Sequence, residues 1–217
     1  MREVQRPYQW HCASRQRGLV LVVALIWLLV ATLLLLSSVQ NALHEQKAAR
    51  AFRDRAIAFQ AAEAGLVDAE SDIEASPSAA LSRSTMFAAN RSDGFPTDEQ
   101  ALCRQAGASR SRGLCRAAQG NALLSLLADD VDASSTSAVA VEYGRFTGRT
   151  LQTGGGALPA RLPRYVIELL RDHDAQFQSD AGSTTPAYLY RITAIGFGPQ
   201  PHTQVVLQSF YRKGMTS

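Results

Sequence analysis

The chain has 217 residues, of which 46% are hydrophobic and 19% are charged, and three of them are cysteines. Once an N-terminal anchor is set aside, this length suits one domain of ordinary size. The net charge of +3 arises in residues 1–18, where four arginines face one glutamate, and the rest of the chain balances 18 basic against 18 acidic side chains. The basic isoelectric point is therefore no argument for a nucleic-acid-binding surface.

Residues 19–36 form an apolar run in which Thr32 is the only polar side chain, and Arg15-Gln16-Arg17-Gly18 precedes it directly. A bilayer core of about 30 Å needs about 20 apolar residues as a helix, with about 17 as the lower limit. The run therefore predicts a membrane-spanning helix, because a backbone in lipid must satisfy its own hydrogen bonds. The basic residues that abut it favour a cytoplasmic N-terminus.

Three interpretations of this run remain open. A secretory signal has an apolar core of about 7–15 residues with a small-residue cleavage site after it, whereas this run is longer and its one candidate site, Leu36 with Ser38, is poor. A plain single-pass anchor keeps everything before the run. A prepilin is cut before the run, after Gly18, and retains the run in the mature protein.

Residues 39–75 predict a continuation of the same helix with one apolar stripe. The stripe repeats every seven residues and consists of Phe52, Phe59, Leu66 and Ile73. Asp68 and Asp72 fall among the charged residues that we assign to the opposite, polar face. Ser76-Pro77 ends the helix, because proline restricts the residue before it. We expect the stripe to cover one face of a sheet.

A dimeric coiled coil is the alternative use of this stripe. Glu63 and Glu70 lie on or beside the stripe at intermediate seam positions, and acids there weaken the coiled-coil reading. Two such acids could pair with arginines of a neighbouring subunit, but surface ion pairs are worth only about 0–1 kcal/mol. We therefore treat them as orienting groups at most.

Residues 76–137 are expected to be a loop region, with a short helix at residues 117–127. Cys103 and Cys115 are an even pair in this region, and they predict a disulfide in an oxidising compartment such as the periplasm. Two free thiols, or a zinc site, are the alternatives. Asp129-Asp130-Val131-Asp132 could hold calcium, but the spacing is not that of an EF-hand loop, so a solvated acidic loop is the simpler interpretation.

Four strand patterns follow, at residues 138–146, 165–170, 187–197 and 203–212. A five-residue turn between the last two suits a hairpin. The expected fold is therefore α+β, with one long N-terminal helix packed on a C-terminal antiparallel sheet of about four strands.

No enzymatic activity is expected, because the chain offers no convergent set of reactive groups. His44 is expected on the helix just outside the membrane and His202 in a turn, and only His173, in Asp172-His173-Asp174, is flanked by carboxylates on both sides. Adjacent residues after a strand point to different sides, so they do not converge on one ion. We predict no catalytic residue, no metal site and no cofactor.

Three stretches carry a resemblance to a known family. The junction Arg15-Gln16-Arg17-Gly18 with its apolar run looks like a type IV prepilin. Residues 52–66 (FRDRAIAFQAAEAGL), 190–196 (YRITAIG) and 204–211 (QVVLQSFY) resemble the PilX type of minor pilin. The similarity is clear over residues 15–75 and 187–212 and weak or absent between them. The resemblance implies a pilin-like fold.

The resemblance also implies how the N-terminus is processed. A prepilin peptidase cuts after Gly18, and Leu19 becomes an N-methylated terminus where most pilins have Phe. Four residues further on, most pilins have a Glu that pairs with the terminal ammonium of the preceding subunit, and this chain has Val23. A carboxylate in lipid without a partner costs at least about 2.5 kcal/mol. Val23 therefore suits a subunit that starts the fibre and has no predecessor.

These observations predict five segments: a cytoplasmic leader at 1–18, a transmembrane half-helix at 19–38, an amphipathic half-helix at 39–75, a disulfide-bearing loop region at 76–137 and a sheet domain at 138–217. The expected function is that of a minor pilin that primes a type IV pilus and sits at or near its tip. Its expected partners are other minor pilins, the major pilin, the prepilin peptidase and the inner-membrane assembly machinery.

The expected location is the bacterial inner membrane, with a single span and a periplasmic C-terminal domain, and later the pilus. A K-like minor pseudopilin of a type II secretion system is one alternative, because the same physical arguments about the apolar helix and its assembly apply to it. A single-pass periplasmic receptor or anchor protein is the other, and it would retain residues 1–18.

Overall fold

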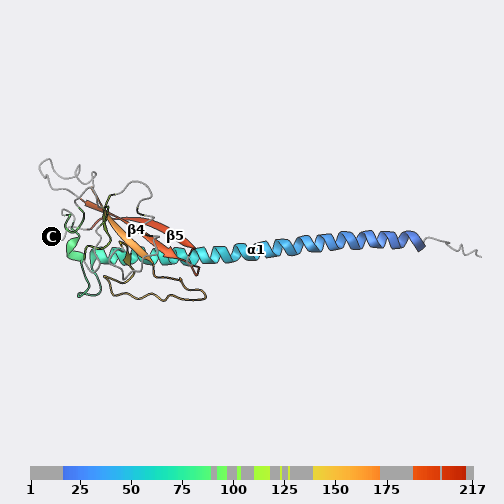
Figure 1. The fold of residues 1–217 in the computed structure, drawn as a ribbon, viewed down its shortest axis with the longest axis horizontal. Helices are drawn as coiled ribbons and strands as arrows, with labels where there is room; N and C mark the ends of the chain where they lie inside the picture. The colour runs from blue at the N-terminus through green and yellow to red at the C-terminus, as the bar shows by residue number, and fades with distance from the viewer. Residues whose placement is uncertain are drawn as a thin grey trace, which may run out of the picture. The chain divides into compact units, whose positions relative to one another are not determined.

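The computed structural model describes residues 17–88, 92–96, 102–103, 110–117, 123, 127, 139–171, 188–200 and 202–213. A long helix is followed by a short 3-10 helix and a sheet (Figure 1), which confirms the expected α+β class. The elements are α1 (Arg17–Glu74), η1 (Ser84–Met86), β1 (Leu114–Arg116), β2 (Val141–Glu142), β3 (Arg164–Arg171), β4 (Tyr188–Phe197) and β5 (Gln204–Tyr211). The chain divides into two compact units, Met1–Arg50 and Ala51–Ser217.

In the first unit, α1 contains an apolar stretch, Leu19–Ser37, that is long and apolar enough to cross a membrane, and it is the one such stretch among the described residues. Its side chains are exposed throughout. The hydroxyl of Thr32 donates to the carbonyl oxygen of Leu29 at 2.8 Å. The only polar side chain of the apolar run is thus satisfied inside the helix, as a lipid environment requires.

The sheet of the second unit has the strand order β1-β3-β4-β5, and β2 also pairs with β3. The pairs β2–β3, β3–β4 and β4–β5 are antiparallel, as expected. The β1–β3 pair is parallel, with Cys115 opposite Glu168, so the sheet is mixed and five-stranded. The sequence analysis missed β1 because its three residues are too few to show an alternating pattern.

Small residues let α1 pack closely against the sheet, and Figure 1 shows β4 and β5 running along its C-terminal part. A Cβ atom added to Gly196 of β4 would lie 2.1 Å from the carbonyl oxygen of Ala58 and 2.2 Å from the backbone nitrogen of Ala62. The helix backbone therefore rests directly on the strand. The small buried side of the helix consists of Ala58, Ala61, Ala62, Gly65 and Ala69.

The buried face of α1 differs from the apolar stripe expected from the sequence. Phe52 and Phe59 are 76% and 43% exposed, Leu66 is half-buried, and only Ile73 is fully buried. The seven-residue spacing follows the large apolar side chains of the helix, but a close approach of helix and sheet requires small side chains. The helix face that packs on the sheet is therefore the one that carries the alanines. The prediction that Phe52 and Phe59 pack on the sheet is wrong.

Both faces of the sheet are covered by buried side chains. Successive residues of a strand point to opposite sides, so neighbouring residues of β3 belong to different clusters. On the side of α1, Tyr165, Ile167, Tyr190 and Ile192 join Ala69 and Ile73 in one hydrophobic cluster. On the opposite side, Val166, Ile195 and Phe197 join Cys103, Cys115, Leu123 and Leu127 in a second cluster. The segment that carries the cysteines therefore serves as the second layer over the sheet.

The strand expected at residues 138–146 is mostly a turn. Only Val141–Glu142 pairs as a strand, residues 143–147 form a turn, and residue 138 lies outside the described residues. Gly144 has φ of 79°, and a Cβ there would lie 2.0 Å from the carbonyl oxygen of Arg149. The glycine fixes a left-handed bend that interrupts the alternating pattern. Of the expected helix at 117–127, Leu123 and Leu127 are helical, and residues 118–122 and 124–126 lie outside the described part.

The end of β5 is bonded to the end of α1. The hydroxyl of Ser209 lies 3.3 Å from Oε1 of Glu70, and Tyr211 donates to Oε2 of Glu74 at 2.8 Å. The ammonium of Lys213 donates to the carbonyl oxygens of Ile73 and Ser84, both at 2.8 Å. Lys213 therefore satisfies one of the carbonyl groups that the last turn of a helix leaves without a partner.

Candidate functional site

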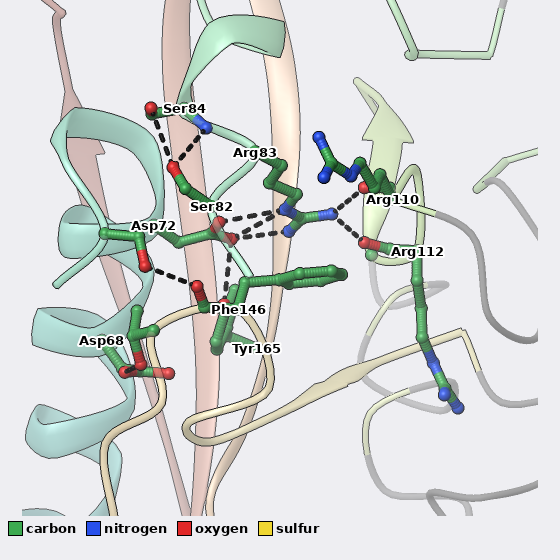
Figure 2. Close-up of polar contacts among 12 residues, drawn as sticks. Asp68, Asp72, Ser82, Arg83, Ser84, Arg110, Arg112, Phe146 and Tyr165 are labelled. Carbon is green, nitrogen blue, oxygen red and sulfur yellow. Dashed lines mark hydrogen bonds and ion pairs between the residues drawn. The ribbon is translucent and has the colours of Figure 1, made fainter. Parts of the chain in front are cut away.

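The second unit contains a buried ion pair at the C-terminal end of α1 (Figure 2). Asp72 and Arg83 are both fully buried, with 2.7 Å between Nη2 of Arg83 and Oδ2 of Asp72. Nε of Arg83 also lies 3.0 Å from each carboxylate oxygen. A two-pronged guanidinium–carboxylate pair of this kind fixes orientation as well as charge.

The remaining contacts of Arg83 join two further parts of the chain. Its Nη1 donates to the carbonyl oxygens of Arg110 at 2.6 Å and Arg112 at 2.5 Å. Its guanidinium carbon lies 3.8 Å from the centre of the Phe146 ring. Arg83 thus bonds the helix to the segment before β1 and to the turn after β2, and its donors are used within the protein.

Tyr165 of β3 completes this cluster by donating to Oδ2 of Asp72 at 2.9 Å. Burial, and then the nearby negative charge of Asp72, raises the pKa of Tyr165 well above its ordinary value. A phenol held neutral at physiological pH is a hydrogen-bond donor and not a base. Tyr165 therefore serves Asp72 as a hydrogen-bond donor and joins β3 to the end of α1.

Asp68, one turn earlier on α1, holds the turn after β2. It is fully buried and accepts hydrogen bonds from the backbone nitrogen of Gly144 at 2.8 Å and from the hydroxyl of Thr147. Burial raises the pKa of the Asp68 carboxyl from 3.8, although the hydrogen bonds from Thr147 and Gly144 oppose that rise. Asp68 is therefore a positioning group for residues 143–148.

Asp68 and Asp72 correct the sequence analysis, which assigned both to the exposed polar face. A signal was present, because both continue the three-and-four spacing of Ala58, Ala61 and Gly65 along one side of the helix. Their charge concealed it, since an aspartate is almost never fully buried unless it is paired. Their partners, Arg83 and Thr147, are 11 and 79 residues away in the sequence, and no local pattern reports them.

Cys103 and Cys115 are joined by a disulfide, as the sequence analysis predicted. Both residues are buried in the cluster on the face of the sheet opposite α1. Cys115 belongs to β1, and the backbone nitrogen of Arg116 donates to the carbonyl oxygen of Leu102 at 2.8 Å. The disulfide therefore fastens the segment around Leu102 to the first strand of the sheet.

Two comparisons with protein-family models match this chain. The model described as "Type IV pilus assembly protein PilX C-term" matches residues 105–213, and the model described as "PilX N-terminal" matches residues 17–67. The chain belongs to the PilX family. The resemblance stated from the sequence is thereby confirmed. A search of curated proteins and a search of solved structures each gave no significant match.

Membership of the PilX family makes the chain a type IV pilus assembly protein of the minor pilin kind. The N-terminal match begins at Arg17 and includes the whole apolar stretch Leu19–Ser37. A single N-terminal helix of that length and composition supports a single-pass, membrane-anchored pilin. The C-terminal match includes all five strands of the sheet.

The residues assigned to PilX-type processing and assembly all lie in the first unit. Gly18, Leu19 and Val23 belong to α1, and the side chains of Leu19 and Val23 are exposed in the isolated chain. An exposed apolar helix suits burial by lipid or by neighbouring subunits. Glu63 is exposed in the second unit, and Glu70 is half-buried beside Ser209.

Asp129–Asp132, the calcium candidate, and Asp172-His173-Asp174 both lie outside the described residues. Within the described ranges, no group of three His, Cys, Asp or Glu side chains could hold a metal ion.

Proposed function

We propose that this PilX-family protein primes the assembly of a type IV pilus and is incorporated at or near the tip of the fibre. The observation that carries the proposal is the residue at position 23. Val23 stands in an exposed apolar helix at the position where, by the resemblance, other pilins carry a glutamate.

In a subunit with the glutamate, the carboxylate gains a partner when it meets the terminal ammonium of the preceding subunit. Without that partner, a carboxylate in the membrane costs at least about 2.5 kcal/mol. Val23 removes both the cost and the attraction. A subunit of this kind gains nothing electrostatic from a predecessor, so it is suited to be the first subunit and to remain distal as others are added below it.

The proposed maturation begins with cleavage after Gly18 on the cytoplasmic side, followed by methylation of Leu19. Residues 19–38 then hold the subunit in the inner membrane, and residues 39–75 carry the helix into the periplasmic part. The loop region at 76–137 and the sheet domain at 138–217 face away from the membrane. The proposed partners are other minor pilins, the major pilin, the prepilin peptidase and the inner-membrane assembly machinery.

N-terminal sequencing of the protein recovered from membranes tests the maturation step. The expected result is a chain that starts at methylated Leu19. A chain that starts at Met1 would instead support a plain anchor. A second measurement tests the pilus role, because deletion of the gene is expected to lower the number of surface pili, and a secretion pseudopilin would leave that number unchanged.

The tip position is tested with Val23→Glu, and Val23→Gln is the matched control because it adds a polar side chain of the same size without the charge. The glutamate variant is expected to gain attraction for a preceding subunit and to occur along the shaft, measured as more immunogold label per fibre. The glutamine variant should keep the label at the tip. Unchanged label and pilus number in the glutamate variant would refute the tip assignment.

A further inference from the structure

Strand β5 ends the sheet, and its outer edge is the basis of this inference. Among the described residues, β4 is the only strand that pairs with β5. The eight residues of β5, QVVLQSFY, contain no proline and no charged side chain. Soluble proteins usually protect an edge strand with charges, prolines or bulges, because its free backbone groups pair readily with another strand. The unprotected edge of β5 therefore suits a partner.

The hairpin register identifies the backbone groups that face outward. The nitrogen of Gly198 donates to the carbonyl oxygen of Thr203 at 2.7 Å, so these two residues form a hydrogen-bonded pair. Bonded and non-bonded pairs alternate along an antiparallel ladder. Val206, opposite Ile195, and Gln208, opposite Thr193, are therefore at non-bonded positions, and their N–H and C=O groups point away from β4.

One flank of α1 lies beside this edge. Gly196 contacts the helix backbone at Ala58, and Ser209 contacts Glu70, so β5 and the helix run in the same direction side by side. Phe59 and Glu63 precede Glu70 by eleven and seven residues and share its side of the helix. Phe59 and Glu63 are exposed, and the β5 side chains that point to the α1 side of the sheet are only half-buried.

The chemistry of this flank indicates the kind of partner. Glu63, Glu70 and Glu74 follow one another along it, while Phe59 adds an apolar surface at its start. The side chains of β5 that point away from the helix include Val206 and Phe210, which are 38% and 61% exposed. A strand added to β5 would thus meet glutamates and a phenylalanine on one side and apolar groups on the other.

We propose that the free edge of β5 and the Phe59–Glu63–Glu70 flank of α1 bind an extended segment of a different protein, added as a further strand. Main-chain hydrogen bonds would supply affinity, and side chains on alternate positions would supply specificity. The segment carries basic side chains on its α1 side, toward the glutamates, and apolar ones on its other side, toward Val206 and Phe210. A second copy of this chain fits less well, because its own β5 has no basic residue to offer. This inference is independent of where the subunit stands in the fibre.

The test uses full-length protein in lipid nanodiscs and three capped eight-residue peptides: alternating Val and Lys, alternating Val and Glu, and a copy of β5. We expect the Val–Lys peptide to bind at least about tenfold more tightly than either of the others, as measured by fluorescence anisotropy. Equal binding of the basic and acidic peptides, no binding of any, or tightest binding of the β5 copy would each overturn the proposal.

Two substitutions locate the binding at this edge. Val206→Pro removes an outward N–H without removing a bond to β4, and Val206→Thr is the matched control that keeps the N–H and the branched side chain. The proline variant is expected to bind the Val–Lys peptide at least about tenfold more weakly, and the threonine variant to bind it as before. Should the proline variant fail to fold, Glu63→Lys is the second test, and it is expected to reverse the preference between basic and acidic peptides. Unchanged binding in either folded variant contradicts the assignment.

Discussion

Gly196 of β4 lies directly against the carbonyl oxygen of Ala58 in α1, with room for a hydrogen atom and no room for a methyl group. A Cβ at Gly196 would stand 2.1 Å from that oxygen. The contact joins two backbones, which cannot move aside as a flexible side chain can. It therefore sets how closely the helix approaches the sheet across the whole second unit.

Gly196→Ala is expected to lower the free energy of unfolding by about 1–3 kcal/mol or more, because overpacking at a rigid contact forces helix and strand apart. Gly155→Ala is the control, since nothing lies within 4 Å of a Cβ at that position. Thermal unfolding of both variants followed by circular dichroism measures the difference. Equal stability of the two variants would show that the helix is not seated on β4 as described.

Arg83→Ala is expected to destabilise the second unit by about 3–5 kcal/mol, because it leaves the buried Asp72 carboxylate without its charged partner. The loss also frees two carbonyl oxygens, of Arg110 and Arg112, from their donor. Arg53→Ala removes an exposed arginine of the same helix-containing unit and serves as the control. Urea denaturation gives both values, and a loss below about 1 kcal/mol at position 83 would contradict a buried pair.

Asp68→Asn tests the raised pKa of Asp68. Because the pKa is higher in the folded state than the ordinary 3.8, the stability that this carboxyl contributes is fully present below pH 3.8 and is lost as the pH rises through the folded pKa. Asparagine does not titrate. The stability advantage of the native protein over the variant should therefore grow as the pH falls from neutral toward 3.8.

The measurement for Asp68 is the difference in melting temperature between the two proteins at several pH values, because other acids then cancel. An advantage that shrinks on acidification would mean that burial does not dominate the environment of Asp68.

Removal of the disulfide by Cys103→Ser with Cys115→Ser is expected to cost about 2–4 kcal/mol on the chain-entropy model for a loop of this size. Both sulfurs are buried, so slow reduction of the native protein by dithiothreitol is a further expected outcome. Stability equal to the native protein would show that the cluster around Leu123 and Leu127 holds the segment without the bond.

The sequence predicted the elements with strong periodicity and missed those that depend on distant partners. The helix, the alternation of Tyr190 and Ile192 against Arg191 and Thr193, and the disulfide are local patterns, and the structure confirms them. The parallel pairing of β1 with β3 depends on residues more than fifty positions apart, which periodicity does not report.

The polar cluster escaped prediction for a related reason. Charged residues at helical spacing usually mark a solvated face. Burial of Asp72 is possible here because the contacts with Arg83 and Tyr165 compensate the desolvation of its carboxylate. The large apolar side chains gave the opposite error. Phe52 and Phe59 were predicted to pack on the sheet, and both are exposed. Size and charge alone do not locate a helix face that is built from alanine and glycine.

The ammonium of Lys213 reaches the carbonyl oxygen of Ile73, a residue made 140 positions earlier in synthesis. The bond can form only after residue 213 has been made, and by then all five strands of the sheet are already present in the chain. Fastening of the last turn of α1 is therefore coupled to a segment that follows the whole sheet in the order of synthesis.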